Sequence, residues 1–588
     1  MKSILQKIWD ILAPAERRNA LLLLGLMVIG MMLETLGVGL VIPAITLLTQ
    51  ENLAARYPAT EPILRALGNP DPQTLVVGGM FVLVGVYLIK ACFLAFLAWR
   101  QTRFAFGVQA QLSQKLFATY LRQPYTFHLQ RNSAQLIRNA LDEVGIFTGN
   151  AMLPGMLILT ECMVLLGVGS LLLLVEPLGA LIVALVLGGA AWGFHRITHV
   201  RIVRWGKERL YHDGMRVQHL QQGLGGAKDV KLLGREGDFL AQYGIHNTQS
   251  ARMGQFQSTL QQLPRLWLEL LAVTGMTLLV LSMLAQGRDI AGIVPTLGLF
   301  AIAAFRLMPS INRVLSSVLS LRYGLAVVDT LHKELKLAMP EAVARHANGA
   351  AFQHEIRLEN LSYTYPGADA AALNGLSIYI RKGESIGFIG TSGAGKSTLV
   401  DVILGLLPPD AGQVTVDGQD IRHDLRHWQD QIGYVPQSIY LTDDTLRRNV
   451  AFGLPDESID DTAVRGAIHA AQLEDFVDSL PDGLETVVGE RGIRLSGGQR
   501  QRIGIARALY HDPSVLVLDE ATSALDTDTE SGVMQAITAL HGSKTIIIVA
   551  HRLSTVEQCD RLYRLEGGRV VEEVVPAETH DNRKAASA

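Results

Sequence analysis

The stretch Gly390-Thr391-Ser392-Gly393-Ala394-Gly395-Lys396-Ser397-Thr398 decides the fold of the second half of this chain. It has the form G-x-x-x-x-G-K-[ST] and stands between a strand-like run, 385–389, and a helix-like run, 399–407. In that context the loop amides and the positive end of the helix converge on a polyphosphate. Lys396 reaches the terminal phosphates, and the Ser397 hydroxyl can ligate Mg²⁺. A glycine-rich turn with a chance lysine would not need the flanking strand and helix.

The composition divides the chain into two different halves. Of the 588 residues, 49% are apolar, which is high for a soluble protein. Long apolar stretches fill residues 1–340, whereas 341–575 read as an ordinary globular α/β domain and 576–588 as a flexible polar tail. The formal net charge of −3 differs from the basic character of nucleic-acid-binding domains. The three cysteines follow no metal-ligand or disulfide spacing.

Six apolar segments of the first half are long enough to cross a bilayer, because a helical span needs about 20 apolar residues. They lie at roughly 20–48, 73–99, 146–175, 177–195, 264–286 and 291–313. Arg17 and Arg18 precede the first segment, so the N-terminus is expected in the cytoplasm. The long segments 100–145 and 196–260 then also face the cytoplasm, and their apolar periodicity predicts helices that continue out of the membrane.

Shorter elements accompany these spans. Residues 4–12 carry an apolar stripe on one face, which predicts a short elbow helix lying on the membrane surface. Residues 50–72, outside the membrane between the first two spans, interleave apolar and charged side chains and predict a small external amphipathic helix. The turns 131–139 and 222–235 lie where the cytoplasmic extensions would contact a partner domain.

Charged residues inside or near the spans are costly and are therefore candidate substrate contacts. They are Lys90, Arg265, Arg306 and Arg313. Arg306 and Arg313 share one helix face, and Lys90 lies at a similar depth in the cytoplasmic half of the membrane. A basic belt in a cavity would suit a phosphate or pyrophosphate. The alternative is snorkelling or pairing, since Arg265 stands four residues before Glu269 and Glu161 lies at comparable depth.

Further polar residues follow the glycine loop at strand ends. Asp519 and Glu520 end the buried-strand run 514–518, so Asp519 can hold Mg²⁺ through water and Glu520 can activate the attacking water as a general base. Gln437 can touch both the metal and that water. His551, after another strand, can contact the γ-phosphate. Phosphoryl transfer depends mainly on such positioning and charge neutralisation.

Two more elements complete the expected ATP site. Tyr365, about 25 residues before the loop, is placed to stack on adenine. The segment Leu495-Ser496-Gly497-Gly498-Gln499 opens a predicted helix. This ordered set resembles the nucleotide-binding domain of ABC transporters, and the segment matches that family's signature motif without substitution. The resemblance implies that Ser496, Gly498 and Gln499 complete the ATP site of the opposite subunit.

One membrane half and one ATPase half resemble an exporter-type half-transporter that must form a homodimer. The implied fold is a polytopic α-helical membrane domain of six transmembrane helices fused to an α/β P-loop nucleotide-binding domain. The implied activity is Mg²⁺-dependent ATP hydrolysis that drives transport. The resemblance also implies a multi-pass protein of the bacterial inner membrane with a cytoplasmic ATPase, in which 131–139 and 222–235 act as coupling helices.

The membrane half resembles the bacterial lipid-linked oligosaccharide flippases of protein N-glycosylation. The similarity lies in Glu34-Thr35, in Val41 to Leu47, in Pro264 to Glu269, and in Phe305 to Arg313. It implies translocation of a polyprenyl-pyrophosphate oligosaccharide to the outer leaflet, with the basic belt neutralising the pyrophosphate. Lys90 departs from the family pattern, which has an arginine there, and so lacks the bidentate fork.

Two other functions remain open from the sequence. A multidrug or bulk-lipid exporter, including one for a lipid A-like substrate, would have an apolar or aromatic cavity. A soluble ABC ATPase of DNA repair or translation would lack the membrane spans.

Overall fold

A computed structural model describes residues 4–40, 72–175, 177–285, 290–338, 352–489, 492–521, 527–550 and 552–575. The chain divides into two compact units. The first comprises residues 1–123 and 130–339, and the second comprises 124–129 and 340–588. The expected external helix at 50–72 and the tail at 576–588 lie outside the described residues, apart from the start of one helix at Pro72.

The first unit is helical throughout its described residues. Its successive elements are α1 (Ile4–Ile11), α2 (Pro14–Gly39), α6 (Pro72–Leu121), α8 (Ser133–Arg138), α9 (Val144–Phe147), α10 (Leu153–Val175), α11 (Pro177–Gly225), α12 (Ala227–Leu233), α13 (Glu236–Ala285), α14 (Ile290–Tyr323) and α15 (Leu325–Glu334). Two π-helical turns, Asn139–Glu143 and Thr148–Met152, flank α9. Local signals set several ends: Pro14 begins α2, the Asn132 side chain caps α8, and Gly234 ends α12 in the left-handed conformation.

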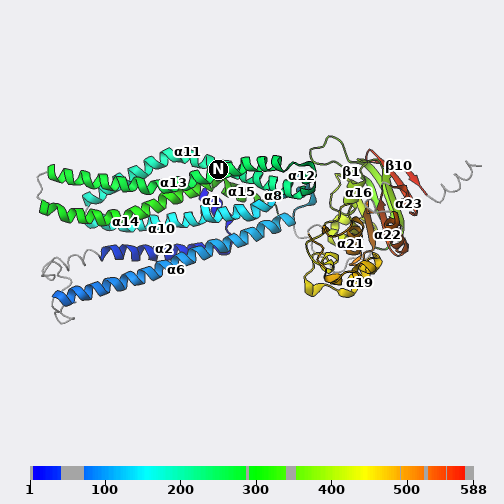
Figure 1. Ribbon diagram of the computed structural model, residues 1–588, viewed down its shortest axis with the longest axis horizontal. Helices are drawn as coiled ribbons and strands as arrows, with labels where there is room; N and C mark the ends of the chain where they lie inside the picture. Colours follow the sequence, from blue (N-terminus) through cyan, green and yellow to red (C-terminus); the bar gives the residue numbers. More distant parts are fainter. Residues whose placement is uncertain are drawn as a thin grey trace, which may run out of the picture. The chain divides into compact units, whose positions relative to one another are not determined.

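The long helices α2, α6, α10, α11, α13 and α14 overlap the six predicted spans in part and run side by side (Figure 1). Residues 41–48 of the first predicted span lie outside the described residues. Helix α10 packs against both α2 and α14, and α13 packs against α11 and α14. Their shared core joins Val164 of α10, Leu268 of α13 and Leu307 of α14. Many other large apolar side chains on these helices are exposed, as lipid-facing side chains must be.

Length and composition identify three described helical stretches that can each cross a membrane: 14–39, 76–121 and 133–171. The pair Leu307–Tyr323 and Leu325–Glu334, bent by 47°, makes a fourth if it counts as one span. The predicted spans 177–195 and 264–286 lie in α11 and α13, whose long extensions carry many polar residues beyond the apolar part.

The elbow helix is present as α1, which packs on α15. The Lys7 ammonium lies 2.6 Å from Asp329 Oδ1, and Asp10 Oδ2 lies 3.5 Å from the His332 ring. The polar face of α1 is thus held by α15, while Trp9 stays exposed.

A short helix, α7 (Tyr125–Gln130), begins inside a segment, 124–129, that belongs to the second unit. Burial raises the pKa of Tyr125, and nearby Asp401 and Tyr365 raise it further. The predicted coupling segments 131–139 and 222–235 contain α8 and α12, and both lie in the first unit. The segment of the first half that belongs to the ATPase unit is therefore 124–129, not 131–139 or 222–235. The coupling role of 131–139 and 222–235 stays a prediction.

The second unit contains two sheets and several helices. Its strands are β1 (Glu355–Tyr363), β2 (Leu373–Arg381), β3 (Ser385–Gly390), β4 (Ala411–Val416), β5 (Gln419–Asp420), β6 (Ile432–Val435), β7 (Val515–Asp519), β8 (Thr545–Val549), β9 (Arg561–Glu566) and β10 (Arg569–Val574). Its helices are α16 (Lys396–Ile403), α17 (Leu425–Asp430), α18 (Leu446–Val450), α19 (Asp461–Ala470), α20 (Glu474–Asp478), α21 (Gly497–Leu509), α22 (Thr527–Ala539) and α23 (Leu553–Val556).

One sheet is antiparallel in the order β2-β1-β4-β5, and the other has the order β10-β9-β3-β8-β7-β6 with β9, β3, β8, β7 and β6 parallel. Alternate residues of β7 enter different cores, because successive strand side chains point to opposite faces. Val515 and Val517 pack in the core that includes Leu399 of α16, and Leu516 packs in the core that includes Ile503 of α21. Both faces of this sheet are covered, so the carboxyl ends of its parallel strands are where polar groups can gather.

Candidate nucleotide site and membrane charges

The glycine loop connects β3 to α16, as the sequence predicts. Gly390 has φ +153° and Gly395 has φ +100°. A Cβ on Gly390 would lie 2.4 Å from the Leu565 carbonyl oxygen, and a Cβ on Gly395 would lie 2.5 Å from that of Ala372. Both positions therefore exclude any larger residue, and the loop can wrap closely around the start of α16.

Lys396 is buried at the first position of α16 and points back into the loop. Its Nζ donates to the carbonyl oxygens of Gly390 at 2.9 Å and Thr391 at 3.0 Å. Burial lowers the pKa of Lys396, whereas Glu520 and Asp519 act in the opposite direction. The two carboxylates are therefore close enough to influence the ammonium, so the loop and the end of β7 form one site.

Asp519 and Glu520 end β7, and the backbone fixes the position of Glu520. Glu520 has φ +51°, a left-handed conformation that is unfavourable for a side chain with a Cβ. Its backbone N–H donates to the Val549 carbonyl at the end of β8, at 3.0 Å. The Gln437 amide donates to Glu520 Oε2 at 2.6 Å. Three segments far apart in sequence thus meet at one carboxylate, as predicted for the hydrolytic centre.

The predicted metal ligands are Ser397, Gln437 and Asp519. They offer a hydroxyl, an amide carbonyl and a carboxylate, and Mg²⁺ prefers such oxygen donors together with waters and substrate phosphates. Ser397 is exposed in the first turn of α16, and Asp519 is buried at the end of β7. The donor set fits Mg²⁺ bound together with a nucleotide.

Tyr365 lies beside the loop, and its hydroxyl is 3.2 Å from Thr398 Oγ1. Its ring meets the Tyr363 ring edge to face, with centroids 5.1 Å apart. Thr398 is buried and contacts Tyr365, whereas Ser392 and Gly393 are exposed at the tip of the loop, and the nucleotide-binding roles of all three stay predictions. The adenine-stacking role of Tyr365 remains a prediction.

The signature segment begins α21 with a reciprocal cap. The Gln499 backbone N–H donates to Ser496 Oγ at 3.2 Å, and the Ser496 N–H donates to Gln499 Oε1 at 2.8 Å. Ser496 is exposed, and Gly498 in the first turn adds no side chain over the helix amides. A pre-formed, exposed helix N-terminus of this kind is suited to a phosphate.

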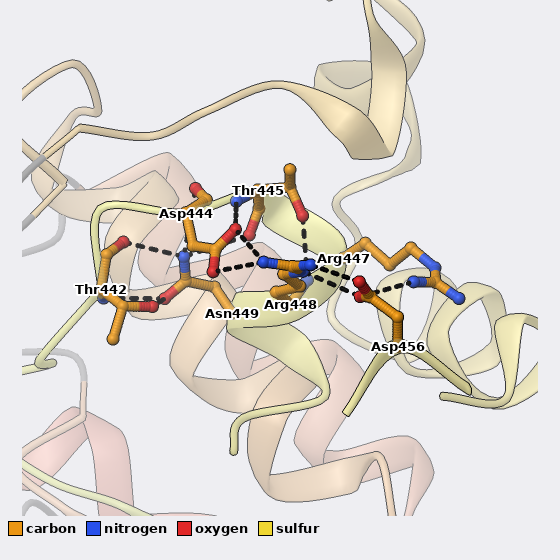
Figure 2. Close-up of polar contacts among 7 residues, drawn as sticks. All are labelled: Thr442, Asp444, Thr445, Arg447, Arg448, Asn449 and Asp456. Atoms are coloured by element: carbon orange, nitrogen blue, oxygen red, sulfur yellow. Dashed lines mark hydrogen bonds and ion pairs between the residues drawn. The ribbon is translucent and has the colours of Figure 1, made fainter. Parts of the chain in front are cut away.

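A polar cluster that the sequence did not reveal holds the chain between Gln437 and α21 (Figure 2). The Arg448 guanidinium lies between Asp444, 3.2 Å away, and Asp456, 2.8 Å away. Fully buried Asn449 donates to the Thr442 carbonyl at 3.0 Å and accepts the Thr442 N–H at the same distance. Asp444 and Arg448 stand four residues apart, but no spacing rule links Asp456 to Arg448 or Thr442 to Asn449, because those partners lie outside the helix.

Arg507 connects this cluster to the signature helix. From α21 it donates to the carbonyls of Asn449 at 2.9 Å and Tyr440 at 2.8 Å. Burial lowers its pKa to about 10. The segment that follows Gln437 is therefore attached to the helix that begins with Ser496.

Asp401 is a second feature that the sequence did not reveal. It lies on α16 near Asp519, and burial, together with that neighbour, raises the pKa of its carboxyl to about 6. An aspartate on a helix gives no sequence signal of this kind, since the shift depends on tertiary burial. His551 lies outside the described residues, so its predicted contact with the γ-phosphate stays a prediction.

The candidate substrate residues with described side chains are each paired with a carboxylate. Lys90 Nζ lies 3.2 Å from Glu34 Oε2 and 4.2 Å from the centre of the Tyr87 ring. Arg313 lies 2.5 Å from Glu161, and Arg265 lies 2.9 Å from Glu269. The pairing alternative therefore accounts for these three. The Arg306 side chain lies outside the described part of α14.

The family model for the ABC transporter matches residues 373–523, which include the loop, Gln437, the signature segment and Glu520. The ATP-dependent lipid A-core flippase of Thiobacillus denitrificans is 32% identical over 536 residues, covering 87% of this chain and 90% of that protein. The corresponding flippase of Ralstonia nicotianae is 31% identical over 471 residues, covering 79% and 78%.

A solved structure of a bacterial Atm1-family ABC exporter with ATP bound has the same fold. It aligns over 96% of both chains with a TM-score of 0.77 and 24% identity. A helical membrane unit fused to a P-loop ATPase unit defines an exporter-type half-transporter. This chain belongs to the ABC transporter family. It is a multi-pass membrane protein whose ATP-hydrolysing domain is cytoplasmic, which confirms the predicted fold class and enzyme class.

Proposed function

We propose that this chain is an ATP-driven flippase for a phosphorylated glycolipid of the lipid A-core kind. It would move that lipid from the inner to the outer leaflet of the bacterial inner membrane. The observation that carries the proposal is the set of relatives, 29–32% identical over most of this chain, that are named ATP-dependent lipid A-core flippases. These relatives favour the bulk-lipid alternative over the oligosaccharide flippase.

The membrane charges also weaken the argument for a pyrophosphate-binding belt. Lys90, Arg265 and Arg313 would have to leave their carboxylates before they could neutralise an incoming anion. Binding of a pyrophosphate would break these ion pairs. The net binding free energy would therefore be less favourable than if the same cations had no carboxylate partner. A polyprenyl-pyrophosphate oligosaccharide is kept as the competing cargo in the test below.

At the ATP site, each residue has a defined task in the proposed cycle. Lys396 exchanges its bonds to the loop carbonyls for phosphate oxygens. The Glu520 carboxylate accepts the proton of the attacking water, and Gln437 orients that carboxylate. Mg²⁺, held with Ser397, Gln437 and Asp519, would neutralise phosphate charge.

A second copy of the chain would complete the site. Ser496 lies at an exposed helix N-terminus, and the family resemblance implies that Ser496 and Gly498 close over the ATP held by the loop of the opposite subunit. Two chains arranged head to tail would then enclose two ATP molecules between loop and signature segment. Transport requires only that ATP favours this closed arrangement over the open one.

The decisive test is translocation in proteoliposomes that contain the full-length protein. A lipid A-core glycolipid and a polyprenyl-pyrophosphate glycan are offered separately, and their appearance in the opposite leaflet is measured with and without ATP. We expect ATP-dependent movement of the first and none above the Glu520→Gln background for the second. Movement of the second alone would restore the oligosaccharide flippase. Movement of neither, with ATPase stimulated by hydrophobic drugs, would indicate a multidrug exporter.

A further inference from the structure

A polar cavity of about 350 Å³ lies between α2 and α6 in the first unit. Glu16, Asn19 and Leu23 line it from α2. The lining residues from α6 are Arg100, Arg103, Phe104, Gly107, Val108 and Gln111. The cavity thus joins one acid, two guanidinium groups and two amides to an apolar wall. None of these residues belongs to the ATP site or to the proposed substrate set.

The charges in this cavity are not matched by the protein. Neither Arg100 nor Arg103 forms an ion pair with any described residue, and Arg103 lies over the Trp99 ring at 5.3 Å. Glu16 is only 5% exposed. Its Oε2 accepts the Ala13 N–H at 2.9 Å, but its Oε1 is buried without a hydrogen-bond partner among the described residues. A buried carboxylate oxygen of this kind is costly unless a donor, preferably a cation, occupies the cavity.

The membrane end of the cavity lies at the depth of the lipid headgroups of the cytoplasmic leaflet. At 1.5 Å per residue, Arg100 and Arg103 lie about 36 and 40 Å along α6 from Val76, where the apolar span begins. The hydrocarbon core is about 30 Å thick, and headgroups extend it to about 40–45 Å in all. Measured from the outer edge of the hydrocarbon, the inner headgroup layer extends from about 30 to about 37 Å. Arg100 therefore lies within that layer and Arg103 at its cytoplasmic border, and Leu23 is the apolar lining residue on the membrane side.

We propose that this cavity binds the headgroup of a phospholipid that carries both a phosphate and a primary ammonium. The phosphate would lie between Arg100 and Arg103, since guanidinium groups match phosphate oxygens. The ammonium would donate to Glu16 Oε1, and the glycerol and upper acyl chain would contact Leu23, which lies further into the membrane than Glu16 along α2. A purely anionic headgroup supplies no counter-charge for Glu16, so the site discriminates between lipid classes.

The test uses the purified full-length protein in detergent and native mass spectrometry. Dioleoyl phosphatidylethanolamine and dioleoyl phosphatidylglycerol are titrated separately, and bound lipids are counted. We expect the wild type to retain the ethanolamine lipid about tenfold more strongly, which is the size of one charge-assisted hydrogen bond. In Glu16→Gln, that preference should disappear while binding of both lipids persists, because the glutamine still accepts the Ala13 N–H. In Arg100→Gln/Arg103→Gln, both lipids should bind at least tenfold more weakly.

Arg196→Gln is the matched control, since Arg196 is an exposed arginine on α11. It should leave both affinities unchanged. ATPase activity and the size-exclusion profile verify that each variant is folded. Because lipid binding is measured without transport, its result does not depend on whether the proposed glycolipid is the transported substrate. Equal binding of the two lipids by the wild type would overturn the proposal. So would unchanged binding in the Arg100→Gln/Arg103→Gln protein, which would mean that something else, such as a second copy, fills the cavity.

Discussion

The ATPase unit and the membrane unit both contain groups that would bind phosphate, yet they hold them in opposite ways. In the ATPase unit, Lys396, Gln437 and Glu520 come from distant segments and meet at the ends of β3, β6 and β7. In the membrane unit, Lys90 and Arg313 each lie against a carboxylate of a neighbouring helix. In a globular interior, backbone amides at strand ends can form hydrogen bonds with charged groups. The backbone groups of a membrane helix are already bonded within the helix, so its charged side chains pair with other side chains.

The different surroundings of the charged residues in the two units indicate different roles for them. The ATPase groups accept a strained backbone at Glu520 and a buried ammonium at Lys396, and these costs are typical of functional sites. In the membrane unit each of these charges has an opposite charge beside it, so the larger cost arises when one partner is removed. Removing one member of a pair should therefore reveal a structural role in the membrane unit and a chemical role in the ATPase unit.

The largest effect is expected from Glu520→Gln. Without the carboxylate that accepts the water proton, ATP hydrolysis should fall by about 10²–10⁴-fold, while ATP binding is retained. Phosphate release and nucleotide binding are measured on the same detergent-purified protein. Glu566→Gln, at an exposed position in β9, is the control and should keep full activity. Hydrolysis within threefold of the wild type would remove Glu520 from its proposed role.

The next effect tests the membrane unit. Lys90→Met removes the cationic partner of buried Glu34 and should destabilise the protein by on the order of 3 kcal/mol. The double variant Lys90→Met/Glu34→Gln should recover most of that loss, as measured by thermal unfolding in detergent. Arg265→Gln breaks a less buried pair at the membrane boundary and should destabilise the protein less than Lys90→Met does.

Translocation by the Lys90→Met/Glu34→Gln variant distinguishes a structural role of Lys90 from a role in cargo binding. If Lys90 serves only to pair with Glu34, the recovered protein should transport its glycolipid at the wild-type rate. A stable double variant without translocation would instead place Lys90 among the cargo-binding residues.

A smaller effect should come from Arg507→Met. This change removes the hydrogen bonds that attach Tyr440 and Asn449 to the signature helix, so Gln437 loses part of its support. We expect kcat for ATP to fall by about tenfold with little change in KM, because small displacements of catalytic groups reduce rate more than binding. The exposed Arg465→Gln serves as control. A change in KM alone would show that the cluster of Figure 2 supports nucleotide binding instead.

The smallest effect concerns pH. Burial raises the pKa of Asp401 to about 6, above its ordinary value of 3.8. The folded protein therefore binds more protons than the unfolded chain between these values, and stability falls as pH rises through this range. Asp401→Asn removes the penalty and should raise the Tm at pH 7.5 by about 2–4 °C, or about 1 kcal/mol after solvent screening.

The Tm of both proteins is followed from pH 4.5 to 7.5 without nucleotide. The difference between them should shrink toward pH 4.5, where Asp401 is protonated. Asp369→Asn, at an exposed position, should show no such pH-dependent difference. A constant difference across the range would mean that Asp401 does not titrate as described.

The sequence predicts which residues form the ATP site because its chemistry needs particular residue types at fixed spacing, and the roles of those residues stay predictions. Gly390, Gly395 and Lys396 lie where the loop pattern requires them, and Asp519 and Glu520 end a strand. It did not predict that Ser496 and Gln499 cap each other, or that Arg507 holds the segment after Gln437. The cap of Ser496 and Gln499 is local, whereas Arg507 contacts residues 58 and 67 positions away, and contacts at that range leave no periodic signal.

For the membrane half, the sequence by itself determined the apolar segments and their charges, since hydropathy is a property of the chain. Only the tertiary structure decided what those charges do. Lys90 is separated from Glu34 by more than fifty residues, and only the packing of α2 against α6 brings them together. The same packing forms the cavity of Glu16, Arg100 and Arg103. The role of a charged side chain in a membrane helix depends on the group beside it, and helix packing, not sequence spacing, determines which group that is.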